Sequence, residues 1–178
     1  LIGSITGIVA GLFKKIEWII QPLILLLLSV PAIIFVTMSM VWFGIGTKMV
    51  VFLISLLVFP VMHTNMATGI KSIDLHLKEM AHIYRLPRLQ KLYKIYLPGM
   101  RGHMITGFSL ALFSSMRLTI MSEMLGAVDG MGQRISISRA YLETDRLFAW
   151  IIILLTILLF LEFVIVRPLK KWTRTDGV

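Results

Sequence analysis

Long apolar stretches alternate with short polar ones along most of the chain. Apolar residues dominate from about Pro22 to Phe43, from Val50 to Ile70 and from Leu147 to Val166, and a weaker apolar stretch runs from His103 to Ser122. Each stretch approaches the roughly 20 residues that a helix needs to cross a hydrocarbon core of about 30 Å. The pattern therefore predicts an all-α membrane protein built as a multi-pass helical bundle.

The apolar opening Leu1 to Leu12 is shorter than the roughly 17–25 residues of a spanning helix. No basic segment precedes it and no small-residue cleavage site follows the usual pattern, so a secretory signal is not expected. We interpret it as the end of a truncated helix and expect residues 1–178 to form one transmembrane domain that lacks N-terminal sequence. Two spans contain a central proline, Pro31 and Pro60, and we expect kinked helices there, because neighbouring helices and water satisfy the freed carbonyls.

Composition excludes several classes of protein. The chain is 57% hydrophobic with a mean hydropathy of +0.88, whereas soluble domains are roughly 45–50% apolar. There is no cysteine, and the four histidines lack metal-ligand spacing, so no disulfide and no metal site are expected. No Gly-x-x-x-x-Gly-Lys-Ser/Thr phosphate loop and no nucleophile with a nearby base occur, so we predict neither a cofactor in this chain nor a catalytic residue.

The net charge of +9 reflects an uneven distribution of the 18 Lys and Arg residues. Most lie in three places that alternate loops put on one side of the membrane: Lys14 and Lys15, the segment from Lys71 to Arg101, and the tail from Arg167 onwards. Basic loops face the cytoplasm. We therefore expect the 71–102 loop and the C-terminus on the cytoplasmic side of a bacterial inner membrane, and no nucleic-acid partner.

Residues 72–98 of this loop read as two short amphipathic helices, with Ser72 as the N-cap of the first and Pro87 between them. Their apolar positions are Ile73, Leu77, Met80 or Ala81, and Tyr84 in the first helix, and Leu89, Leu92, Tyr93 and Tyr96 in the second. One interpretation is a pair of helices lying on an anionic leaflet. The other is a compact peg that a cytoplasmic partner grips.

The same residues resemble a known family. Glu79-Met80-Ala81, followed by Leu97-Pro98, is similar to the EAA loop of ABC importer permeases, although Met80 replaces the usual alanine and Arg85 a usual glycine. Four further segments resemble the nitrate/sulfonate/taurine branch in order and spacing: Phe43-Gly44-Ile45-Gly46, Glu123-Met124-Leu125-Gly126, Gly130-Met131-Gly132 and Thr144-Asp145-Arg146-Leu147-Phe148-Ala149.

The resemblance implies a type I ABC importer transmembrane domain that forms the solute path and couples to a separate ATPase. The implied partners are ABC ATPase subunits that bind ATP and Mg, a second permease subunit, in a homodimer, and an external substrate-binding protein. The implied ATPase-coupling residues are Ile73, Leu77, Glu79, Met80, Ala81, Tyr84, Arg85, Leu97 and Pro98. Two alternatives are a secondary transporter or channel without an ATPase, for which the inverted-repeat signature is absent, and a purely structural membrane subunit.

Arg117 is an ionisable residue deep in a span, and such residues indicate function by default. Its guanidinium could favour a passing anion, or it could snorkel or pair with an acid on another helix. The candidate path residues are Ser114, Ser115, Arg117 and Glu123 in this span, and His63 and Asn65 in the preceding one. His63 and Asn65 could equally hydrogen-bond between helices. The sequence leaves the solute open among sulfonate, nitrate, taurine and vitamin precursors.

Overall fold

The computed structural model describes residues 1–84 and 87–174, and these residues form helices and no strand. The elements are α1 (Ile2–Leu12), α2 (Lys14–Ser29), α3 (Ala32–Phe43), α4 (Thr47–Lys71), α5 (Leu75–Ile83), α6 (Arg88–Lys91), η1 (Leu92–Tyr96), α7 (Leu97–Gly99), α8 (Arg101–Gly126), α9 (Met131–Ala140), α10 (Thr144–Leu161), η2 (Glu162–Val166) and α11 (Arg167–Arg174). The elements η1 and η2 are π-helical turns. The predicted all-α fold is confirmed.

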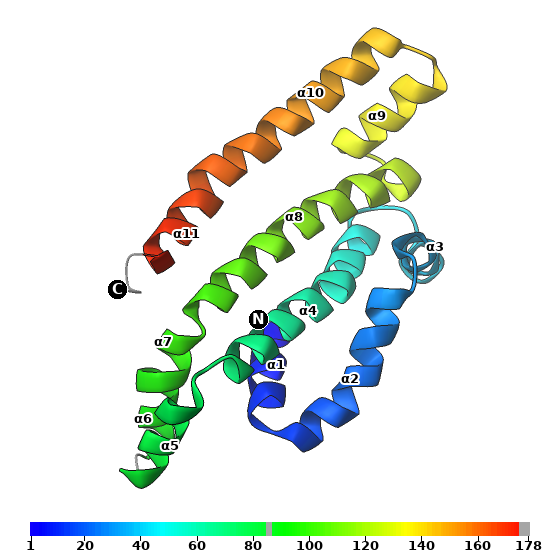
Figure 1. Ribbon diagram of the computed structural model, residues 1–178. Coiled ribbons are helices and arrows are strands. Elements are labelled where there is room, and N and C mark those ends of the chain that lie inside the picture. Colours follow the sequence, from blue (N-terminus) through cyan, green and yellow to red (C-terminus); the bar gives the residue numbers. More distant parts are fainter. Residues whose placement is uncertain (85–86, 175–178) are drawn as a thin grey trace.

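Three helical stretches in the described part of the chain are long and apolar enough to cross a membrane: Thr47–Lys71, Arg101–Gly126 and Thr144–Leu169. They correspond to the predicted spans at 50–70, 103–122 and 147–166. Figure 1 shows that the last of them, α10 with its continuation α11, runs beside α8 but is separated from it along most of its length.

Helix α4 is the centre of the bundle and packs against α1 on one side and α8 on another (Figure 1). The contact with α1 is close because Gly3, Gly7 and Gly11 face α4. A Cβ atom at Gly3 would lie 2.8 Å from the carbonyl oxygen of Phe59, and one at Gly7 would lie 2.4 Å from that of His63. Small residues at this four-residue spacing let membrane helices approach backbone to backbone. The spacing of these glycines is visible in the sequence, whereas length and hydropathy alone do not indicate a close helix contact.

The kink expected at Pro31, in the stretch from Pro22 to Phe43, is a sharp break, because the chain turns by 96° between α2 and α3. Pro31 lacks an N–H group and disfavours helical geometry at the residue before it. Val30 is accordingly extended, with φ −78° and ψ 131°, and α3 begins only at Ala32. The result is a broken helix pair in place of one kinked span.

Pro60, in contrast, stays within the 25-residue helix α4. This proline is almost fully buried, between neighbours that hold the helix on both sides. The hydroxyl of Thr64 also donates a hydrogen bond to the Pro60 carbonyl at 2.8 Å. Packing therefore maintains the helix at Pro60, whereas α2 has few neighbours that could do so at Pro31.

The ends of the helices divide the molecule into two faces. One end of the bundle holds the turn between α1 and α2, the segment from α5 to α7, and α11. Most of the Lys and Arg residues lie at this end. The opposite end contains the α3–α4 turn, the α8–α9 turn and α9. The helix directions thus agree with the alternation of loops that the sequence predicted.

Candidate functional site

The predicted coupling loop stands on an apolar base at the end of the bundle. Ile73 from the loop and Ile95 from η1 join Met66, Ile70 and Met100 in one buried cluster. Ile73 is only 6% exposed and packs on Gly99. The structure therefore places Ile73 in the core of its own chain and not on a face that a partner could contact.

The start of α5 also differs from the predicted one. Ser72 is the C-cap of α4, and its hydroxyl donates a hydrogen bond to the carbonyl of Gly69 at 3.0 Å. Asp74 instead accepts the backbone N–H of His76 at 3.0 Å, directly before the first helical residue, Leu75. Ser72 as N-cap is wrong, because the residue that immediately precedes the helix performs the capping.

An exposed apolar stripe runs along α5. Leu77, Met80 and Tyr84 are spaced by three and four residues, so they lie on one side of the helix. Their exposed fractions are 43%, 42% and 74%. Large side chains that stay exposed together on an amphipathic helix indicate a contact surface for another molecule. These three are the members of the predicted face that are available for docking.

The structure describes three of the remaining predicted coupling residues with their side chains: Glu79, Leu97 and Pro98. Glu79 is exposed and lies 3.8 Å from the ring Nδ1 of His76. Leu97 and Pro98 begin the short α7 just before the buried Met100. Ala81 belongs to α5, but its side chain lies outside the described part of the chain, as does the whole of Arg85.

The buried face of the second amphipathic helix matches the prediction in part, because Tyr96 packs against the apolar base and Leu92 is half-buried. Ile95 is 8% exposed and belongs to the apolar base, whereas Tyr93 is 65% exposed. The π-helical turn η1 includes both residues. Ile95 is three residues after Leu92, so it also shares the side of Leu92 in a regular helix. The side chain of Leu89 lies outside the described part of the chain.

Three glycine-containing segments meet at the opposite end of the bundle. The N–H of Gly46 donates a hydrogen bond to the carbonyl of Gly126 at 3.0 Å. The Glu123 carboxylate accepts the N–H of Gly132 at 2.9 Å, at the start of α9. Gly130 has φ +129°, and a Cβ atom there would lie 2.4 Å from the Glu123 carboxyl carbon. Glu123 thus caps α9 within this chain, and the segments 43–46, 123–126 and 130–132 are connected by these contacts.

Arg117 is exposed on α8 and lines a cavity of about 340 Å³ between α8 and α10. The other lining residues are apolar: Phe113, Ile120, Leu154 and Leu158. No ion pair in the described part of the chain involves Arg117. The guanidinium is therefore left for a group outside these residues, such as water, solute or a second subunit.

Of the other candidate path residues, Ser114 lies on the same side of α8 as Arg117, three residues before it, and the rest do not gather around Arg117. Ser114 is half-buried on α8, and Ser115, whose hydroxyl donates a hydrogen bond to the Leu112 carbonyl at 2.8 Å, lies roughly 160° from Arg117 around the helix. A role of these hydroxyls in a path stays a prediction.

His63 and Asn65 lie where α4 contacts its neighbours. His63 is 5% exposed, and its Nδ1 is 3.2 Å from the Thr6 hydroxyl of α1. The Asn65 amide donates a hydrogen bond to the Val61 carbonyl at 2.8 Å, and its Cβ faces Gly107 of α8. For His63 this geometry matches the alternative in which the residue hydrogen-bonds between two helices. A contact of either residue with solute stays a prediction.

Three apolar helices long enough to cross a membrane, together with a broken helix pair, define a multi-pass membrane protein among the described residues. Comparison with known families agrees: residues 2–172 match the family described as "Binding-protein-dependent transport system inner membrane component". The chain belongs to this family, which confirms the resemblance to type I ABC importer permeases.

Several curated relatives are permease proteins. The chain is 29% identical to the putative aliphatic sulfonates transport permease protein SsuC of Bacillus subtilis (strain 168), over 85% of this chain and 55% of the relative. It is 28% identical to the taurine transport system permease protein TauC of Escherichia coli (strain K12), over 97% of this chain and 64% of the relative. It is 31% identical to the putative aliphatic sulfonates transport permease protein SsuC of Escherichia coli (strain K12), over 77% of this chain and 52% of the relative. The matched part is therefore about half to two-thirds of each relative.

Proposed function

We propose that this chain forms the solute path of an ATP-driven ABC importer and couples it to a separate ATPase that binds ATP and Mg. The family match and the permease relatives support this function over an ATPase-independent transporter or channel. The observation that carries the coupling role is the exposed stripe of Leu77, Met80 and Tyr84 on a helix with a buried base.

The shape of the loop suits force transfer. Ile73 and Met100 fix its base against α4 and α8, so a push on α5 reaches both spans through packed side chains. The stripe itself is apolar and has no cover within the described chain. An ATPase groove of complementary shape would bury it, in the way that amphipathic helices lay an apolar face into a partner's groove.

The orientation and the assembly are part of this proposal. The end that carries α5 and α11 holds most of the 18 basic residues, which supports a cytoplasmic location under the positive-inside rule. The opposite end, with α9, then faces the external binding protein. A second permease subunit completes the path, because α10 buries none of its residues within the chain and the cavity at Arg117 is open.

We propose an organic sulfonate, or another small anion of that type, as the solute. The names of the relatives above support this class. An arginine is suited to it, since the planar guanidinium donates two parallel hydrogen bonds to a tetrahedral or planar oxyanion. Arg117 is the candidate contact.

The coupling role is tested with Leu77→Asp, which puts a charge on the stripe. We expect ATPase subunits to be lost from the purified complex, or ATP hydrolysis to continue without uptake, while the permease still inserts. Leu75→Asp is the matched control, because Leu75 is 64% exposed on the same helix but lies roughly 160° from Leu77. Coupled uptake in the Leu77→Asp complex at the level of this control would refute the coupling role of the stripe.

A further inference from the structure

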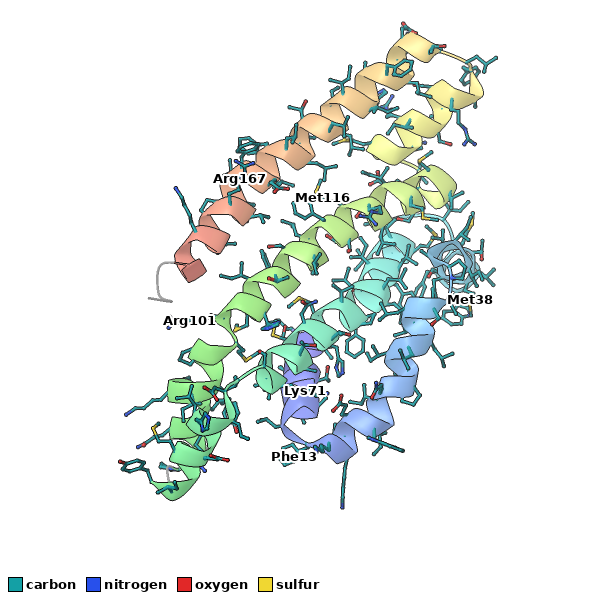
Figure 2. The ribbon with its side chains drawn as sticks, in the orientation of Figure 1. Phe13, Met38, Lys71, Arg101, Met116 and Arg167 are labelled. Carbon is teal, nitrogen blue, oxygen red and sulfur yellow. The ribbon has the colours of Figure 1, made fainter. Side chains whose placement is uncertain are left out.

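A hollow of about 500 Å³ lies where the turn between α1 and α2 meets the end of α4. Its lining residues come from three helices and are Gly11, Lys14, Glu17, Trp18, Gln21 and Lys71. Figure 2 shows Phe13 and Lys71 at this end of the molecule. The volume lies within the range of roughly 300–1,000 Å³ typical of small-molecule sites. Neither the coupling stripe nor the cavity at Arg117 uses these residues.

The hollow carries an excess of positive charge. Lys71 forms an ion pair with Glu17, which holds the lysine at the rim while half of its side chain stays exposed. Lys14 is exposed and takes part in no ion pair within the described residues. Two lysines and one glutamate therefore line the hollow, and its net positive charge is complementary to a single anionic group.

The position along the spans indicates the source of that anion. Lys71 is the last residue of α4 and Lys14 the first of α2, so both lie where these apolar helices end. Trp18 and Ile19 follow on α2 and are 81% and 77% exposed. Tryptophan is typical of the headgroup level of a bilayer, with apolar residues beyond it facing acyl chains.

We propose that this hollow binds the headgroup of an anionic phospholipid, with phosphatidylglycerol as its ligand. The phosphate accepts hydrogen bonds from Lys14 and from the free donors of Lys71. A glycerol hydroxyl donates to the Glu17 carboxylate, which a headgroup without hydroxyls could not do. The acyl chains lie along the exposed apolar side of α2. Basic pockets between spans at the cytoplasmic end recognise lipid headgroups by this chemistry.

The test measures lipid binding to the full-length protein in detergent by native mass spectrometry. Phosphatidylglycerol is compared with phosphatidylcholine of the same acyl chains, in the wild-type protein and in two variants. Lys14→Gln removes one charge from the hollow. Lys15→Gln is the matched control, because it removes an equal charge from the next residue, which does not line the hollow. We expect Lys14→Gln to weaken phosphatidylglycerol binding about fivefold and Lys15→Gln to leave it close to the wild-type value.

Three outcomes would overturn the proposal. Equal binding of the two lipids by the wild-type protein would exclude an anionic headgroup site. Equal weakening by both variants would indicate diffuse attraction to a basic surface in place of a defined hollow. Displacement of the lipid by millimolar inorganic phosphate would indicate a site for a free anion. The measurement needs no transport, so its result is independent of the proposed importer function.

Discussion

The close contact between α1 and α4 makes Gly7→Ala a sharp test of the packing. The new Cβ atom would lie 2.4 Å from the His63 carbonyl oxygen and 2.7 Å from the Met66 Cβ. The first distance is about 1 Å inside ordinary van der Waals contact. Because the obstacle is backbone, no side-chain rotation relieves it, and α1 must move away. A shift of that size also breaks the 3.2 Å hydrogen bond between Thr6 and His63.

The expected loss combines these effects. Overpacking costs about 1–3 kcal/mol, and an interhelical hydrogen bond in a membrane contributes about 0.6 kcal/mol. Alanine also recovers up to about 1 kcal/mol through its higher helix propensity, but this gain cancels when two glycine-to-alanine variants are compared. The matched control is Gly102→Ala on α8, where a Cβ atom meets nothing within 4 Å. We expect the free energy of unfolding in mixed micelles to be about 2 kcal/mol lower for Gly7→Ala than for Gly102→Ala. Equal values for the two variants would refute the proposed backbone contact.

Three further predictions follow from single contacts. Glu123→Ala removes the acceptor at the start of α9 and should destabilise that helix by about 1–2 kcal/mol, seen as faster amide hydrogen exchange in residues 131–140; unchanged exchange would contradict the cap. Pro31→Ala should let α2 and α3 straighten. Because the chain has no cysteine, spin labels on cysteines introduced at Leu23 and Val41 can report the backbone separation, about 19 Å when the pair is bent and about 27 Å when it is straight. An unchanged distance would show that the proline does not cause the break. Arg117→Met should abolish sulfonate uptake with normal expression while Arg117→Lys retains part of it; full uptake by the methionine variant would exclude an anion contact.

The sequence predicts the spans well wherever hydropathy alone decides the structure. The stretches 50–70, 103–122 and 147–166 are helical. In hydrocarbon, a single segment can hydrogen-bond its own backbone N–H and C=O groups only as a helix. Hydropathy does not describe helix continuity, so it did not separate Pro31, which breaks its span, from Pro60, which does not. That difference depends on neighbours: Pro60 is buried among packed helices, whereas α2 has few contacts.

The candidate site was predictable only in part, for a similar reason. Helical periodicity located Leu77, Met80 and Tyr84, since they share the face of a regular helix. It misplaced Ile73, which is buried under Gly99, because an apolar position looks the same whether it faces the chain's own core or a partner. The prediction also omitted Ile95, which is buried, and included Tyr93, which is 65% exposed.

The positions of the candidate path residues bear on how a path could form. Glu123 caps α9 and His63 contacts α1, so their polar groups already have partners inside the chain. Arg117 has no ion-pair partner among the described residues, and the other walls of its cavity are apolar. A guanidinium left in hydrocarbon would cost at least about 2.5–3.5 kcal/mol. The group that compensates the charge of Arg117 therefore has to come from solvent, solute or a second subunit across the open side of α8 and α10.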